Sequence, residues 1–167
     1  MEIQADGKIV MLDDTGKLIR TDANGSLDTG FGSGGIVSAG YLQDIAIDGN
    51  GGILVGGNIT TGNGNNTKTM MAVKRYTSGG VPDTAFGSGG TATADFNTVT
   101  TSLGKLAVDP YGNIVAAGQV NAPGYAQYYF AAARFTSNGL ADTSFSGTGK
   151  VKYVGASGSG RGVLIQS

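Results

Sequence analysis

The chain contains no cysteine and no histidine, and these two absences remove much of the usual chemistry of enzymes. Without cysteine there are no disulfides, thiolate nucleophiles or thiolate metal ligands. Without histidine the chain lacks both the commonest metal ligand and the commonest general base at neutral pH. Catalysis would have to use Asp, Tyr, Lys or Arg, and no pair of carboxylates stands out from the turn aspartates. The sequence therefore favours a non-catalytic protein that needs no metal or cofactor.

Charged residues are also scarce, at 14% of 167 positions, and the net charge is only -1. So weak a charge leaves no electrostatic footprint for nucleic acid or for an anionic membrane. No apolar run approaches the length of a membrane span, and Met1–Gln4 lacks the basic and hydrophobic pattern of a signal peptide. We therefore expect neither nucleic-acid binding nor membrane insertion.

Glycine, in contrast, is abundant, with 31 residues, and nearly all acidic positions are aspartate. Gly, Asp and Asn favour turns, whereas the helix former Glu occurs only at position 2. Short apolar runs follow Asp-Gly or Asn-Gly pairs, as Ile9–Leu12 follows Asp6-Gly7. This pattern predicts an all-β protein in which short strands are joined by tight turns.

One stretch of sequence recurs three times. In each copy an aspartate follows an arginine by 8 residues, and a phenylalanine comes 3 residues later. Because the trio is present in every copy, we interpret the Arg–Asp pair as a structural corner, with the Phe as a plug of the core. A ring of charge around a pore is the alternative. The repeated residues are Arg20, Asp28 and Phe31, then Arg75, Asp83 and Phe86, then Arg134, Asp142 and Phe145.

Each copy of this corner belongs to a unit with four predicted strands, namely a hairpin, a strand that ends in the arginine, and a weaker fourth strand. Four short strands in a meander of about 55 residues are typical of a β-propeller blade. We therefore predict one repeat domain, built from units 1–41, 42–103 and 104–160, with 161–167 as a closing strand.

Three blades are too few for a closed propeller, which typically has four to eight. Residues 162–167 align with the first strand of a unit, and the first unit largely lacks this strand. We therefore expect the ring to be completed by oligomerisation, and a six-bladed homodimer is favoured over a nine-bladed trimer. In the dimer, residues 163–166 of one copy would pair with residues 8–12 of the other and so cover an open strand edge.

The hairpin Asp6–Val10 and the stretch Asn24–Gly35 resemble the delta-60 repeat family, which consists of tandem repeats in bacterial and phage-associated proteins. The resemblance covers nearly the whole chain and implies β-propeller blades, but it implies no particular reaction or ligand. The third corner departs from the pattern, because Ser146 follows Phe145 where the other corners have glycine. An extracellular, cell-surface or virion-associated location is favoured, and a cytoplasmic one stays open.

The second and third units are longer than the first between their second and third strands. We expect polar loops at 58–68 and 119–129, which should emerge on the same face of the ring. Insertions in repeat proteins commonly carry binding function, and amides beside tyrosine rings suit a sugar or peptide surface. Tyrosines packed on the neighbouring blade are the structural alternative. The candidate ligand-binding residues are Asn63, Asn65, Asn66, Asn121, Tyr125, Gln127, Tyr128 and Tyr129.

Three functions are compatible with these features. The first is a binding module that contacts a glycan or a surface protein through the two loops. The second is an assembly component of a virion or cell surface, in which the open strand edges are functional, and the third and least favoured is an enzyme. The segment Asp22–Gly25 offers oxygen atoms at alternating positions, as calcium prefers, but it lacks further acidic ligands, so we interpret it as a turn.

Overall fold

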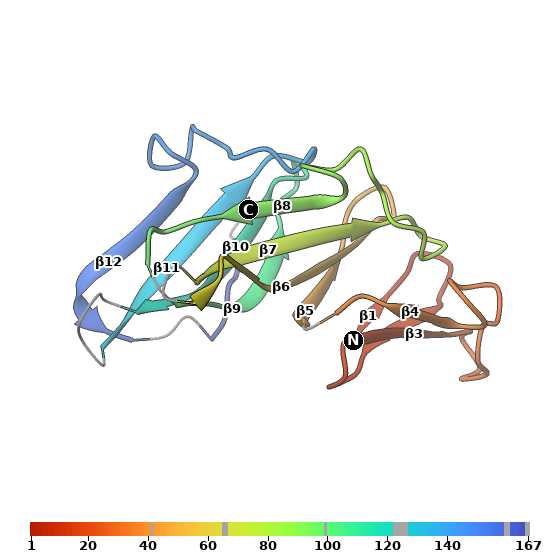
Figure 1. Ribbon diagram of the computed structural model, residues 1–167. Coiled ribbons are helices and arrows are strands. Elements are labelled where there is room, and N and C mark those ends of the chain that lie inside the picture. Colours follow the sequence, from red (N-terminus) through yellow and green to blue (C-terminus); the bar gives the residue numbers. More distant parts are fainter. Residues whose placement is uncertain (41, 65–66, 99, 122–126, 159–160, 166–167) are drawn as a thin grey trace.

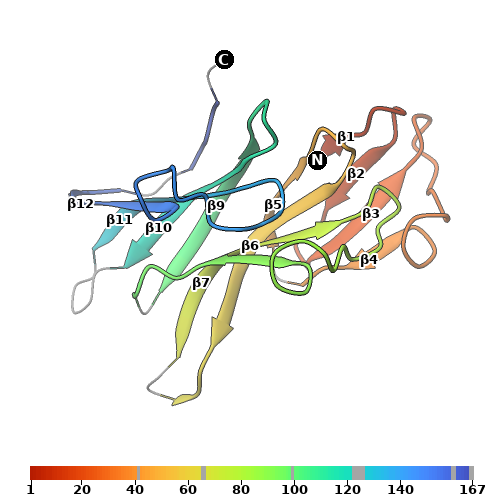
Figure 2. The ribbon, with the colours of Figure 1, turned by 90° about the horizontal axis from the view of Figure 1, so that it is seen from above.

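The computed structural model describes residues 1–40, 42–64, 67–98, 100–121, 127–158 and 161–165. The chain is all-β, as predicted, and it forms three four-stranded antiparallel sheets (Figure 1). Within each sheet the strands lie in sequence order, so every connection joins neighbouring strands. Viewed from above, the sheets follow one another along the molecule, with the first and third at opposite ends (Figure 2).

Each sheet takes its strands from one sequence unit, except that the first strand of the third sheet begins at Thr101, before the predicted start of the third unit at 104. The first contains β1 (Glu2–Ile3), β2 (Ile9–Leu12), β3 (Lys17–Thr21) and β4 (Ile36–Ser38). The second contains β5 (Leu42–Ile47), β6 (Ile53–Thr61), β7 (Lys68–Tyr76) and β8 (Thr91–Ala94). The third contains β9 (Thr101–Val108), β10 (Ile114–Asn121), β11 (Tyr128–Phe135) and β12 (Lys150–Ser157). No helix of the described residues is long and apolar enough to cross a membrane.

Aspartate side chains build the hairpin turns. Asp48 Oδ1 accepts hydrogen bonds from the backbone N–H groups of Asn50, at 2.9 Å, and Gly52, at 2.8 Å. Such bonds stabilise a turn locally, which explains why Asp recurs where one strand must reverse into the next. Asp13, Asp22 and Asp109 accept equivalent pairs of bonds.

The two long hairpins contain more strand than we predicted. Residues 58–68 and 119–129 were expected to be loops, but β6 continues to Thr61 and β10 continues to Asn121. Both strands remain paired with their partners along this extension. The threonines and tyrosines of these stretches favour extended backbone. The two strands of each hairpin therefore stay paired even where apolar and polar residues do not alternate.

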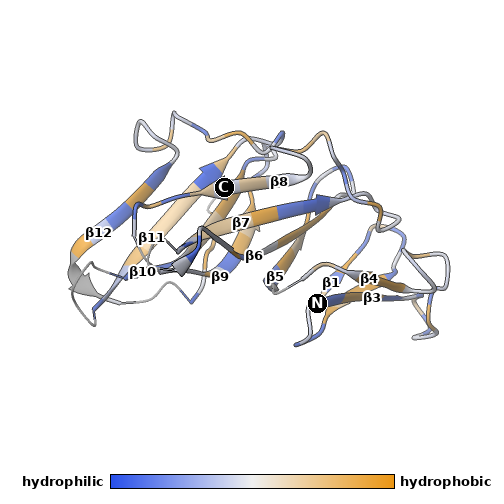
Figure 3. Ribbon diagram, in the orientation of Figure 1, coloured by the Kyte–Doolittle hydropathy of each residue, from blue (hydrophilic) through white to orange (hydrophobic). Residues whose placement is uncertain are grey.

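The core lies in the two seams between successive sheets. In the first seam, Val10, Leu18 and Phe31 of the first unit pack with Ile53 and Val55 of the second. The second seam is larger and joins the second and third sheets in the same manner. Because the middle sheet is covered on both faces, its central strands are nearly continuous apolar runs, and apolar residues concentrate on the strands (Figure 3).

The first strands of the three sheets lie near one another, with β1 beside β5 and β5 beside β9. The strand β1 has only 2 residues, compared with 6 in β5 and 8 in β9. It pairs with Ile9 and Val10. We expected residues 8–12 to pair with residues 163–166 of a second copy, and β1 already occupies part of that edge within the chain. The exchange between copies stays a prediction. Residues 163–165 form no strand, and residue 166 lies outside the described residues.

A pair of glycine substitutions tests how closely the seams are packed. A Cβ atom at Gly80 would lie 2.7 Å from a ring carbon of Phe31, whereas a Cβ atom at Gly89 would meet nothing within 4 Å. Both glycines have positive φ, so alanine is strained at either position by about 1 kcal/mol. We expect Gly89→Ala to cost only that strain and Gly80→Ala to cost about 2–4 kcal/mol in urea unfolding, because overpacking adds to it. Equal losses would contradict the packing of this seam.

Candidate functional site

The repeated corner is the first candidate site, and it begins where the third strand of each sheet ends. There the arginine and aspartate form a hydrogen-bonded ion pair. The second carboxylate oxygen accepts the backbone N–H of the residue two positions later, so each carboxylate is fully engaged. The distances from Arg Nε to Asp Oδ2 are 3.0 Å for Arg20–Asp28, 2.7 Å for Arg75–Asp83 and 2.6 Å for Arg134–Asp142.

The phenylalanine of each corner lies under the guanidinium group of the same corner. The distances from the guanidinium carbon to the ring centroid are 4.5 Å for Phe31, 4.7 Å for Phe86 and 5.1 Å for Phe145. This is a cation–π geometry, which adds to the ion pair. Phe31 and Phe86 are completely buried, whereas Phe145 is only half-buried. The three corners therefore share their internal contacts but differ in what covers them.

The first corner is covered by the turn of the second unit. Arg20 Nη1 donates a hydrogen bond to the backbone carbonyl of Ser78, and the Gly32 N–H donates to the Gly79 carbonyl at 3.0 Å. The ring of Phe31 lies against Gly80, where no side chain would fit. We call this set of three contacts the seam contact.

The second corner makes the same seam contact with the turn of the third unit. Arg75 Nη1 donates to the Ser137 carbonyl at 2.6 Å, and the Gly87 N–H donates to the Asn138 carbonyl at 2.8 Å. The ring of Phe86 lies against Gly139. The corner thus joins successive sheets in addition to shaping its own unit.

Hydrogen bonding and charge lower the pKa of corner carboxylates. A hydrogen bond from Lys8, whose Nζ is 3.1 Å from Asp28 Oδ2, is the largest cause for Asp28, and the Arg20 charge adds to it. For Asp142 the largest cause is a hydrogen bond from the Ser144 hydroxyl, and the pairing with Arg134 again lowers the pKa. Both aspartates are therefore held ionised, which suits an ion pair and does not suit a general acid or base near neutral pH.

Two shallow clefts flank these corners, each of about 260 Å³. One is lined by residues that include Arg20 and Ser78, and the other by residues that include Arg75 and Asp83. The charged groups named here already bond to one another or to the backbone. Among the described residues, no three Asp or Glu side chains gather where they could hold a metal ion. The corner geometry therefore supports a structural role.

The hairpin tips are the second candidate site, and the structure places five of the eight predicted ligand-binding residues. Asn63 and Gln127 are exposed, and Tyr128 has 42% of its surface exposed. The other predicted tyrosine that the structure describes, Tyr129, packs partly against the core. Its hydroxyl donates a hydrogen bond to Gln127 Oε1 at 3.3 Å. Asn65, Asn66 and Tyr125 lie outside the described residues.

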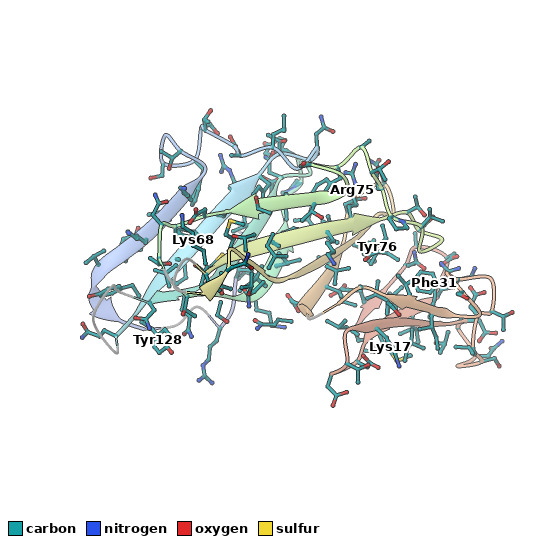
Figure 4. The ribbon with its side chains drawn as sticks, in the orientation of Figure 1. Lys17, Phe31, Lys68, Arg75, Tyr76 and Tyr128 are labelled. Carbon is teal, nitrogen blue, oxygen red and sulfur yellow. The ribbon has the colours of Figure 1, made fainter. Side chains whose placement is uncertain are left out.

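Both extended hairpins reach the same end of the sheets. In Figure 4, Lys68 at the start of β7 and Tyr128 at the start of β11 both lie on the left of the view, while Arg75 and Tyr76 at the other end of β7 lie further right. The fifth predicted residue, Asn121, lies directly opposite Tyr128 in the β10–β11 pairing. Its side-chain oxygen is buried and accepts no hydrogen bond from the described residues. Exposed amides and an exposed ring are therefore presented on the side away from the corners.

Sequence reasoning missed a third group of residues, which lie on the outer faces of the first and third sheets. Phe130 and Tyr153 are in ring contact on the third sheet, with centroids 6.1 Å apart, and Tyr153 is 62% exposed. On the first sheet, Ile9 and Met11 are only half-buried. Aligning these positions with their equivalents in the second unit could have found them, because those equivalents are buried.

The chain matches no protein-family model and no curated protein. The resemblance to delta-60 repeats accordingly stays a prediction from the sequence.

The depressed pKa of Asp142 predicts a pH-dependent contribution to stability. An aspartate with a lowered folded-state pKa stabilises the fold above its ordinary value of 3.8, and this stabilisation is lost as the pH falls through the folded-state pKa. We expect Asp142→Asn to be less stable than the wild type at pH 7. The difference should close progressively below pH 3.8. A constant difference in urea unfolding between pH 7 and pH 2 would contradict the ion-pair assignment.

Proposed function

We propose that the protein is a non-catalytic recognition module whose units are β-propeller blades. One observation carries this proposal: the two extended hairpins present their tips on the same side of the molecule (Figure 4). On the opposite side, the first two corners are engaged in holding the sheets together. A rigid set of sheets with exposed hairpin ends on one side is a common architecture for binding.

The chemistry of the tips suits a carbohydrate or a polar protein surface. The exposed ring of Tyr128 can stack on the apolar face of a sugar, and its hydroxyl can hydrogen-bond. The Gln127 side-chain oxygen accepts a bond from Tyr129, which leaves the amide NH₂ group as a donor to a ligand. Asn63 adds an exposed amide on the second hairpin. Tyrosine and amide side chains together are typical of adaptable binding surfaces.

The arrangement of the strands supports the assignment to propeller blades. The neighbouring first strands β1, β5 and β9 correspond to the inner strands of a propeller, and β4, β8 and β12 to the outer ones. Successive sheets pack face to face through the seams, as blades do. In this proposal a second copy completes the ring.

A non-catalytic role agrees with the state of the ionisable groups. The repeated aspartates are paired with arginines and backbone N–H groups, and each guanidinium is held over a ring. Groups that are already satisfied in this way have little capacity to transfer protons.

The second candidate is an assembly component, for example of a virion or a cell surface. It is favoured by the apolar residues on the outer faces of the first and third sheets, of which Ile3 and Tyr153 are each 62% exposed. Exposed apolar patches on otherwise polar proteins commonly mark sites of association.

A glycan array with matched tyrosine variants tests the recognition role. Tyr128 lies at the hairpin tips, whereas Tyr111 is 87% exposed on the turn between β9 and β10, at the other end of β10. We expect the wild type to retain at least one class of glycan and Tyr128→Ala to weaken binding about tenfold or more, because loss of a stacking anchor costs more than about 1 kcal/mol. Tyr111→Ala should bind like the wild type. A blank array, or equal losses in both variants, would overturn carbohydrate recognition by the tips.

A further inference from the structure

The third corner presents the donors of the seam contact without their acceptors. Arg134 binds Asp142 and Ser144, but among the described residues its Nη1 group meets no carbonyl equivalent to that of Ser78 or Ser137. The N–H of Ser146 corresponds to those of Gly32 and Gly87, and it has no hydrogen-bond partner among the described residues. Phe145 is half-buried, and no glycine turn in the described part of the chain covers it as Gly80 and Gly139 cover its two counterparts.

The first unit presents the complementary acceptors. Its turn Asp22–Gly25 corresponds to Thr77–Gly80 and Thr136–Gly139, the two turns that cover the preceding corners. The carbonyls of Ala23 and Asn24 accept no hydrogen bond from the described residues. A Cβ atom at Gly25 would meet nothing within 4 Å, although the equivalent atoms at the other two turns would strike a phenylalanine ring.

Both surfaces already have the backbone conformation that the seam contact requires. Gly25 has φ of +86°, close to +85° at Gly80 in the first seam. Ser146 has φ of +54°, next to +56° at Gly87. A left-handed conformation costs an L-residue such as serine about 1 kcal/mol or more, so its presence shows that the third corner is held in the joining geometry.

The outer face of the third sheet continues this match beyond the corner. Val115, Phe130 and Tyr153 occupy the positions of Leu54, Met71 and Ala94 in the second sheet. Those three residues of the second sheet are buried in the second seam, whereas Tyr153 is 62% exposed. The third sheet thus has an apolar face of the kind that the second sheet buries.

The outer face of the first sheet is apolar in the same way. Ile9 and Met11 occupy the positions of Ile53 and Val55, which are completely buried in the first seam. Both are half-buried, and Ile19 beside Met11 is also half-buried. The two ends of the molecule therefore carry the two halves of one seam.

We propose that the third sheet of one copy packs on the first sheet of a second copy through a seam contact. Arg134 donates to the Ala23 carbonyl, the Ser146 N–H donates to the Asn24 carbonyl, and the ring of Phe145 covers Gly25. This joint is head-to-tail, so two copies that make it twice close a ring of six sheets. It takes the place of the strand exchange expected from the sequence, and it does not depend on what the hairpin tips bind.

Matched variants at the two ends test this joint by measuring mass in solution. Gly25→Asn keeps a residue that tolerates positive φ but adds bulk where Phe145 should sit. Gly34→Asn is the control, because Gly34 has φ of +63° and open space, as does its equivalent Gly89 in the middle unit. At the other end, Tyr153→Asp places a charge on the apolar face, and Tyr111→Asp is the exposed control.

We expect sedimentation equilibrium to give the wild type and both controls twice the chain mass of 16.7 kDa. The Gly25→Asn and Tyr153→Asp variants should each have a dimer dissociation constant at least about tenfold higher than that of the wild type. Mixing these two variants should restore association, because the third sheet of Gly25→Asn and the first sheet of Tyr153→Asp are both intact and together form one joint. In a symmetric dimer that pairs two identical faces, mixing would not restore association. A wild type that stays at 16.7 kDa, or variants that match their controls, would overturn the proposal.

Discussion

The contact between each corner and the turn of the following unit is the interaction on which the structure depends. Sheets whose strands have only two to nine residues cannot bury enough surface alone. The seam contact fixes how one sheet faces the next, because the arginine, the backbone N–H and the aromatic ring must all meet the same turn. The apolar residues behind the corner are then buried in register, and the core forms between sheets.

The Arg–Asp–Phe corner and the four-stranded unit could be predicted because they are local. Their residues are close in sequence, and comparison of the three copies separates the repeated Arg, Asp and Phe from the residues that differ between copies. Other features depend on contacts between distant segments. The pairing of β1 with Ile9 and Val10 and the extension of β6 to Thr61 have no apolar alternation to reveal them. The apolar outer faces could be recognised only from the strand pairing, which shows that residues at the positions equivalent to Tyr153 and Ile9 are buried in the second sheet.

Repetition also separates structure from function in this molecule. In the first two corners the arginine, the aspartate and the phenylalanine all contact partners within the chain, so these corners have few groups left to bind a ligand. The features that do not repeat are the hairpin tips around Tyr128, which suit recognition, and the third corner with Ser146 in place of glycine, which suits association. The seam contact accounts for the stacking of the sheets within the chain, and our proposal that it is also used between chains would account for the apolar ends.

Amide hydrogen exchange at three equivalent positions tests this account most directly. The N–H groups of Gly32 and Gly87 donate hydrogen bonds across the two seams, whereas the N–H group of Ser146 has no acceptor among the described residues. We predict strong protection of the Gly32 and Gly87 amides at any protein concentration. The Ser146 amide should exchange fast in dilute solution and approach the protection of the other two as the concentration rises. Protection of Ser146 that does not change with concentration, or fast exchange at Gly32 and Gly87, would contradict it.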